Sequence, residues 1–270
     1  MALPGQASAQ PFFLQARTGS RFCLFHRPAG ECRAALVYLH PFAEEMNKSR
    51  RMAGLAARAL AAQGVAVLQM DLHGCGDSSG EFRDARWESW KEDALLAATW
   101  LRGQAACPVG LWGLRLGALL ALDAAALVEP DRILLWHPVL KGEQFLTQFL
   151  RLRLASDMLQ SGADSGGTKA LRAQLKAGET LEIAGYELAP ALASAMDTLD
   201  AAQLAPSCPV DWLELGQDVS PASSRVIAAW GGELAAHAVP GPQFWCTQEI
   251  EDAPALVDAT TALLREAVHA

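Results

Sequence analysis

The stretch 109–125 limits the possible folds of this chain more than any other. It contains a short apolar strand, a turn between Gly113 and Gly117, and a helix rich in alanine and leucine. In the G-x-S-x-G elbow, two glycines leave room for a sharp turn from strand to helix, and the residue between them is held above the sheet in strained backbone geometry. Here that residue is Arg115, a side chain that stays protonated and cannot attack a carbonyl group. The stretch therefore predicts the scaffold of an elbow without its nucleophile.

Apolar runs alternate with helical segments on both sides of this elbow. Short apolar runs are typical of buried strands, and segments rich in alanine and leucine that end at glycine or proline are typical of helices. Strands are expected at 11–15, 21–26, 34–39, 65–70, 109–112, 132–136, 210–215 and 233–239. Helices are expected at 48–63, 87–101, 115–127, 223–230 and 254–269. The alternation predicts an α/β fold with a mostly parallel sheet and helices on both faces.

The alternation breaks between residues 141 and 206. An amphipathic helical segment at 145–159 is followed at 161–167 by a flexible stretch rich in glycine and serine. A connection of this length without structure of its own is uncommon in a compact domain, so a helical cap over the strand ends explains the insertion better. We therefore expect one core made of 1–140 and 207–270, with 141–206 as a helical cap.

Composition narrows the classes of partner. The chain has a hydrophobic content of 51%, enough for a large core, and a formal net charge of -8. An acidic surface disfavours nucleic acids and anionic membranes. No segment has the roughly 18 apolar residues of a membrane span, and residues 1–10 lack the basic and apolar parts of an export signal. We expect a cytoplasmic protein with no nucleic-acid partner and no membrane span.

The cysteines and glycines give no sign of a cofactor. The six cysteines show no C-x-x-C spacing and lie far apart in the sequence, at positions 23, 32, 75, 107, 208 and 246. This spacing favours reduced, mostly buried thiols over a zinc site or a compact disulfide framework. No glycine-rich phosphate loop and no cluster of metal-ligand residues is present in the sequence. We expect neither a metal nor a nucleotide or other cofactor.

Three motifs carry a resemblance to known proteins. They are the run from His40 to Arg51 (HPFAEEMNKSRR), the run from Asp71 to Ser78 (DLHGCGDS), and Gly113 to Gly117 (GLRLG). On these motifs the chain resembles α/β-hydrolases over nearly its whole length and, more narrowly, the exosortase A system-associated hydrolase family, type 2. The resemblance implies an α/β-hydrolase fold and a bacterial protein encoded with exopolysaccharide and protein-sorting genes. The word hydrolase in that family name describes the fold as much as a reaction.

The three positions of a catalytic triad can be followed along the chain. Enzymes with this fold carry the nucleophile, the acid and the base in that order. Arg115 stands at the nucleophile position, and Asp218, after the strand that follows the cap, fits the acid. Residues 239–245, after the last strand, contain no histidine, while His237 lies within that strand and His269 in the terminal helix. Because two of the three triad members are missing, we do not expect ordinary serine-type acyl transfer.

The groups that remain suit the binding of an anion. The backbone N–H of Leu116 lies at a helix N-terminus and that of Phe42 in the loop after the strand at 34–39, and together they resemble an oxyanion hole. Arg115 adds a positive charge beside them. A planar guanidinium, two amide groups and a helix dipole are suited to a carboxylate or a phosphate.

Arg115 has two other interpretations. Glu44 or Glu45 in the facing loop, or Asp218, is able to pair with it and fill the former active site. An unfamiliar form of catalysis that uses the arginine is the third interpretation. The contacts that the guanidinium of Arg115 makes in the folded protein distinguish internal pairing from ligand binding and catalysis.

Other residues near the predicted site have both a chemical and a structural interpretation. Cys75 lies in the same loop as His73, and a thiolate beside an imidazole is a known nucleophile arrangement, although a buried thiol is the commoner case. Ser78 belongs to a glycine-rich turn. His40 and His137 each end a buried strand, where a histidine either contacts a ligand or holds its loop by hydrogen bonds.

The tryptophans are expected mainly in the interior. Four of them occur in or just after predicted strands, at 112, 136, 212 and 245. Core packing or pocket lining is the first interpretation for such positions, and stacking against a sugar is the second.

Two classes of function follow. The first is a protein with an α/β-hydrolase fold that binds a small anionic or acyl ligand, or a protein partner of the exopolysaccharide and protein-sorting system, without serine-type catalysis. The second is a hydrolase of the esterase, thioesterase or acyl-transfer type that uses residues outside the triad. Both classes of function have to explain why an arginine stands at the nucleophile position, residue 115.

Overall fold

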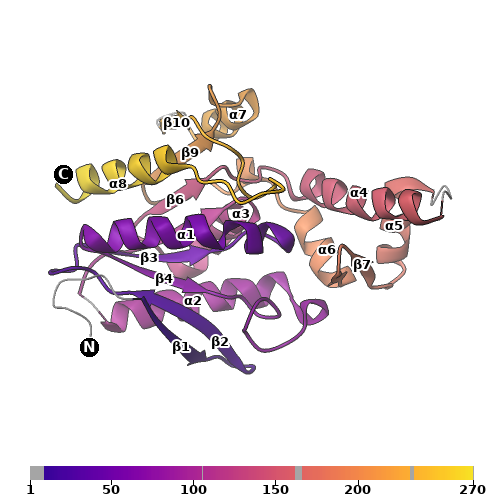
Figure 1. The fold of residues 1–270 in the computed structure, drawn as a ribbon, viewed down its shortest axis with the longest axis horizontal. Coiled ribbons are helices and arrows are strands. Elements are labelled where there is room, and N and C mark those ends of the chain that lie inside the picture. Colours follow the sequence, from indigo (N-terminus) through magenta and orange to yellow (C-terminus); the bar gives the residue numbers. More distant parts are fainter. Residues whose placement is uncertain (1–8, 105, 162–165, 232–233, 270) are drawn as a thin grey trace.

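The protein forms an eight-stranded sheet covered by helices (Figure 1). The computed structural model describes residues 9–104, 106–161, 166–231 and 234–269. The strand order is β1-β2-β4-β3-β5-β6-β9-β10. The strands are β1 (Ala9–Gln15), β2 (Ser20–His26), β3 (Ala34–Leu39), β4 (Val65–Met70), β5 (Val109–Leu114), β6 (Ile133–Trp136), β9 (Val210–Leu215) and β10 (Ala236–Val239). Only β2 pairs antiparallel, with β1 and β4, so the prediction of a mostly parallel sheet is confirmed.

Helices bury both faces of this sheet, as an α/β fold requires. On one face lie α1 (Glu44–Ala62) and α8 (Pro254–His269), which run side by side in Figure 1. On the other face lie α2 (Trp87–Gln104), α3 (Leu116–Val128) and α7 (Pro221–Ala229). The apolar side chains form two buried clusters, one on each side of the sheet. Apolar packing therefore covers both faces of the sheet, and the ends of the strands remain available for functional residues.

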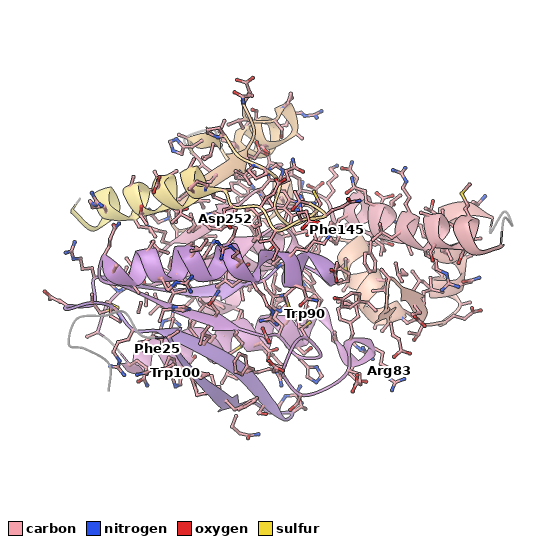
Figure 2. All side chains as sticks on the ribbon, viewed as in Figure 1. Phe25, Arg83, Trp90, Trp100, Phe145 and Asp252 are labelled. Atoms are coloured by element: carbon pink, nitrogen blue, oxygen red, sulfur yellow. The ribbon has the colours of Figure 1, made fainter. Side chains whose placement is uncertain are left out.

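Specific contacts fix the outer elements to the centre. The ring of Phe25 in β2 packs edge-on against Trp100 of α2, with 5.1 Å between centroids (Figure 2). Arg51 of α1 forms two hydrogen bonds of 2.8 Å each with the carboxylate of Asp252, just before α8. These contacts fix the hairpin β1–β2 against α2, and the segment before α8 against α1.

Residues between β6 and β9 form a separate group of small elements. These are α4 (Gly142–Ser161), α5 (Gly167–Lys176), β7 (Leu181–Ile183), β8 (Tyr186–Leu188), α6 (Pro190–Asp197) and the short helix η2 (Ala201–Gln203). Figure 1 shows α4, α5, α6 and β7 to the right of the sheet. The predicted helical segment at 145–159 lies inside α4, whereas the hairpin β7–β8 was not predicted because three-residue strands carry too little alternation to recognise. The flexible stretch predicted at 161–167 lies largely outside the described residues, and the division into core and cap stays a prediction.

Most predicted elements match the observed ones within a few residues. The strands at 34–39, 65–70 and 210–215 have the predicted bounds. Helix α1 begins at Glu44 rather than at 48, because two acidic residues stand in its first turn, where the helix dipole favours negative charge. The last strand is shorter than 233–239, and residues 232–233 lie outside the described part, as do residues 1–8 of the segment 1–10.

None of the helices in the described ranges is both long and apolar enough to cross a bilayer.

Candidate functional site

The turn after β5 has the elbow geometry. Arg115 has φ 56° and ψ −118°, a backbone conformation that L-residues rarely adopt. Its N–H donates a hydrogen bond of 3.0 Å to the carbonyl oxygen of Trp136 in the neighbouring strand. Gly117, at the start of α3, lies so close to β3 that a Cβ atom there would overlap the carbonyl oxygens of Leu39 and His40. The second glycine of the motif is therefore needed for the close approach of α3 to the sheet.

This contact predicts a cost for Gly117→Ala. We expect the substitution to lower the free energy of unfolding by about 2 kcal/mol, because the added methyl group meets main-chain atoms that cannot rotate away. Urea denaturation followed by circular dichroism measures the change. Gly103→Ala in α2 is the matched control, since a Cβ there has open space and alanine favours a helix. Equal stabilities of the two variants would contradict the role of Gly117.

Three adjacent strand ends carry strained residues that are not glycine. Ala43 after β3 has φ 51°, Arg115 after β5 has φ 56°, and His137 after β6 has φ 41°. Such conformations cost about 1 to 3 kcal/mol each and gather at functional sites. The strain thus concentrates where β3, β5 and β6 end side by side.

Arg115 has an incomplete set of partners. One terminal nitrogen of its guanidinium lies 3.5 Å from Oε1 of Glu45, and the guanidinium carbon lies 5.1 Å from the ring centroid of Trp245. Its Nε is buried and has no hydrogen-bond partner. The side chain keeps 16% of its surface exposed. The ion pair is long and involves one contact, so it does not use the bidentate geometry that a guanidinium offers.

Glu45, not Glu44, is the carboxylate that faces the elbow. Burial raises the pKa of Glu45, and the charge and hydrogen bond of Arg115 oppose this rise. One carboxylate oxygen of Glu45 is buried without a hydrogen-bond partner. Glu44 is exposed and instead accepts a hydrogen bond of 3.3 Å from the hydroxyl of Tyr186 in β8. Protonation of Glu45 therefore costs less free energy than that of an exposed glutamate.

His137 and Trp245 complete the surroundings of the guanidinium. Nδ1 of His137 accepts a hydrogen bond of 3.1 Å from the N–H of Leu215, which leaves the proton of the neutral ring on Nε2. Burial, followed by the charge of Arg115, lowers the pKa of His137 to about 4. Its ring packs on Trp245, with 4.8 Å between centroids. Trp245 lies in the segment after β10 where a catalytic histidine was expected, and it contacts both side chains.

The predicted oxyanion hole has its two donors available. Among the described residues, no acceptor is found for the N–H of Phe42 or that of Leu116. The ring of Phe42 packs edge-on against Phe149 of α4, with 5.0 Å between centroids, and against Trp90 of α2, with 6.1 Å. The insertion thus lies directly over the loop that carries one donor.

Two other predicted histidines are held by hydrogen bonds to neighbouring segments of the chain. His40 donates from Nδ1 to the carbonyl oxygen of Pro41 at 2.7 Å and accepts at Nε2 from the N–H of Leu72 at 3.2 Å, so both ring nitrogens are occupied. His73 lies in the glycine-rich loop, where its main-chain N–H donates to Asp93. Burial lowers the pKa of both imidazoles. Both rings are therefore neutral near pH 7.

Cys75 and Ser78 are set in a packed loop. Burial, and next the charge of Asp71, raises the pKa of the Cys75 thiol well above its usual range, which disfavours a thiolate. Cys75 lines a cavity of only about 10 Å³ together with His40, Phe42 and Leu116. The hydroxyl of Ser78 donates to the main-chain oxygen of Asp71 and accepts from the N–H of Phe22. The geometry gives neither residue the properties of an activated nucleophile.

Asp218 lies in the turn after β9, where the acid of a triad is expected. Its side chain is exposed, and no contact with Arg115 is found among the described residues. The buried carboxylate nearby is Glu214, which accepts hydrogen bonds from the N–H and hydroxyl of Ser220 and from the hydroxyl of Ser223, at the start of α7. Within the described ranges, no group of three metal-ligand side chains comes together.

The sequence predicted Trp245 as a core or pocket-lining residue, with stacking against a sugar as the second interpretation, and did not join it to Arg115. Its distance from the elbow is 130 residues along the chain, from 115 to 245, and no local pattern joins the two. The signal available in the sequence was its place after the last strand, where the base of a triad is expected.

Comparisons with known proteins agree with this fold. A family model described as serine aminopeptidase, S33, matches residues 30–176, more than half of the chain. The human protein ABHD12B is 31% identical over 112 residues, which cover 41% of this chain and 30% of that protein. This chain therefore spans less than a third of the length of that curated relative.

Solved structures match almost the whole chain. One is Est1E from Butyrivibrio proteoclasticus with bound ferulic acid, with a TM-score of 0.67 and 14% identity over 96% of this chain and 100% of that one. Another is a thermostable carboxyl esterase from Bacillus coagulans in complex with glycerol, with a TM-score of 0.66 and 13% identity over 97% of this chain and 99% of that one. At such identities the likeness establishes the fold alone. The chain has the α/β-hydrolase fold and belongs to the serine aminopeptidase S33 family.

Proposed function

We propose that this chain binds a small anionic or acyl ligand at Arg115 and does not carry out ordinary serine-type hydrolysis. The observation that carries this proposal is the unsatisfied guanidinium: it stands at the tip of a strained elbow with one contact of 3.5 Å and a buried Nε without a partner. A carboxylate or phosphate forms two parallel hydrogen bonds with such a group. We propose the N–H groups of Phe42 and Leu116, for which no acceptor is found among the described residues, as further donors to the ligand.

The charge of Glu45 controls how strongly the ligand binds to Arg115. Its carboxylate competes with an incoming anion for Arg115 as long as it is ionised. Because burial raises the pKa of Glu45, protonation of this carboxyl costs less free energy than that of an exposed glutamate, and the protonated group is able to donate a hydrogen bond to the ligand. We therefore expect anion binding to strengthen as the pH falls through the titration of Glu45.

Calorimetric titration with acetate, butyrate, octanoate and inorganic phosphate tests the proposal. We expect at least one of these anions to bind, and Arg115→Ala to raise its Kd by about 10-fold or more, since a hydrogen bond to a charged group contributes about 1.5 to 3 kcal/mol. Arg83→Ala is the matched control, because Arg83 forms a similar 3.5 Å ion pair on the surface. If none of the anions distinguishes the wild type from Arg115→Ala, the arginine serves internal pairing with Glu45 and the proposal fails.

A hydrolase of the esterase, thioesterase or acyl-transfer type is the alternative. It is favoured by the carboxyl esterase among the structures with the same fold and by the N–H groups of Phe42 and Leu116, which have no acceptor among the described residues. Assays with p-nitrophenyl esters of several chain lengths distinguish the two functions. Activity that copurifies with the wild type and disappears in Cys75→Ala or Ser78→Ala would favour the hydrolase.

The motif from His40 to Arg51 supports a narrower assignment. This run forms the loop after β3 and the first turns of α1, including Glu45. Because it resembles the exosortase-associated family, we propose that the protein serves a bacterial exopolysaccharide and protein-sorting system from the cytoplasm, with 141–206 as a cap on a core of 1–140 and 207–270. Cell fractionation, and the exopolysaccharide yield of a strain that carries Arg115→Ala, test this assignment.

A further inference from the structure

Two cysteines meet at the end of the sheet opposite the elbow. Cys32 lies just before β3 and Cys107 just before β5, and their Sγ atoms are 2.7 Å apart. A covalent S–S bond measures about 2.05 Å, so a small movement of either side chain brings the two sulfurs to bonding distance. The 75 positions that separate them in the sequence hide this proximity.

The strand ladder holds the two cysteines in register. Strands β3 and β5 are parallel neighbours, and Ala35, the second residue of β3, pairs with Val109, the first residue of β5. The N–H of Ala35 donates a hydrogen bond of 2.8 Å to the carbonyl oxygen of Pro108. Both cysteines therefore lie next to one hydrogen-bonded pair of strands. This pair of strands, and not the position of two independent loops, sets the distance between the sulfurs.

Solvent exposure makes the pair open to exchange chemistry. The thiol of Cys32 donates to the carbonyl oxygen of Ala34 at 3.3 Å, and its Sγ also lies within hydrogen-bond distance of Sγ of Cys107. Burial, and next the hydrogen bond with Cys32, raises the pKa of Cys107 to about 12, which disfavours its thiolate and leaves the first attack on a reagent to Cys32. Both side chains are partly exposed, whereas Cys23 and Cys75 are buried. A reagent in solution thus reaches this pair and not the buried thiols.

We propose that Cys32 and Cys107 are a modification site that a small-molecule disulfide of the glutathione type converts into an intrachain disulfide. One protein thiolate attacks the reagent, which forms a mixed disulfide and releases one thiol. The second cysteine then attacks the mixed disulfide and releases the second thiol. The protein loses two S–H bonds and gains one S–S bond, and the two electrons reduce one molecule of the reagent to two thiols.

The link encloses a defined part of the fold. The chain between the two cysteines contains β3, α1, β4 and α2, and the link lies at the amino ends of the strands, while Arg115 follows the carboxyl end of β5. Closing a loop of this length removes conformations of the unfolded chain. The disulfide is expected to raise thermal stability and to leave ligand binding at Arg115 unchanged, so the failure of one proposal does not imply the failure of the other.

Thiol counting on the full chain tests the proposal. The reduced protein is equilibrated with oxidised glutathione at about pH 8, unfolded, treated with N-ethylmaleimide and analysed by intact mass and peptide mapping. We expect a peptide that joins Cys32 to Cys107, and no maleimide group on either of these two cysteines. The melting temperature is expected to rise by about 5 to 10 °C and to return after treatment with dithiothreitol.

Cys208→Ser is the matched control, since Cys208 also precedes a strand at the same end of the sheet and is partly exposed. This variant is expected to form the link, whereas Cys32→Ser and Cys107→Ser lose both the link and the rise in melting temperature. Full alkylation of both cysteines after equilibration, or a link that maps to other cysteines, would overturn the proposal.

Discussion

Asp93→Asn is expected to lower the free energy of unfolding by about 3 to 5 kcal/mol. Asp93 of α2 accepts a hydrogen bond of 2.7 Å from Nε of Arg21 in β2, and the two side chains are only 3% and 2% exposed. Its other oxygen accepts from the N–H of His73 at 2.7 Å. The amide leaves the charge of Arg21 buried without a counterion, so urea denaturation should show a much earlier midpoint.

The ion pair between Arg17 and Glu92 provides the control. It lies next to the buried pair in the sequence, has a similar length of 3.2 Å, and its side chains are 76% and 54% exposed. Glu92→Gln is expected to cost less than about 1 kcal/mol, because water screens such pairs. If Asp93→Asn lowers the free energy of unfolding no more than Glu92→Gln does, burial does not strengthen the ion pair between Arg21 and Asp93.

His137 is expected to make the fold less stable in acid. Burial and Arg115 lower the pKa of His137 from 6.5 to about 4, so below pH 6.5 the unfolded chain binds a proton that the folded chain does not. The stability from this group is present above about pH 6.5 and is lost as the pH falls toward 4, with a total of about 3 kcal/mol. Urea denaturation at a series of pH values measures the loss.

His137→Asn isolates this contribution from that of the carboxylates. Asparagine tolerates the positive φ of 41° and carries an oxygen that accepts the Leu215 N–H, but it does not titrate. The difference in stability between wild type and variant should shrink by about 3 kcal/mol between pH 7 and pH 4. Parallel curves for the two proteins would show that His137 is not the titrating group.

The elbow illustrates what a local pattern is able to predict. Gly113 and Gly117 around an arginine, after an apolar strand and before a helix, specify the turn, because each requirement concerns neighbours in the sequence. The pattern also placed Arg115 at the tip and left three carboxylates as its partners. Only the fold chose among them: Glu45 faces the guanidinium, Glu44 contacts Tyr186, and Asp218 is exposed.

Contacts between distant segments account for the parts that were not predicted. Trp245 reaches Arg115 only because β10 returns the chain to the carboxyl end of the sheet, and no spacing rule predicts that return from the sequence. Cys32 and Cys107 were expected as separate reduced thiols, yet β3 and β5 bring them together. A cysteine spacing of this length carries no information until the strand order is known.

The sequence by itself determined the class of fold, the strands that form its parallel sheet, and an elbow whose tip carries a charge in place of a nucleophile. These features depend on hydrophobic periodicity and on backbone requirements that act over a few residues. Only the folded structure shows that Glu45, His137 and Trp245 surround Arg115, and that Cys32 and Cys107 meet at the opposite end of the strands. Such contacts depend on strand order and packing, which join residues that are far apart in the chain.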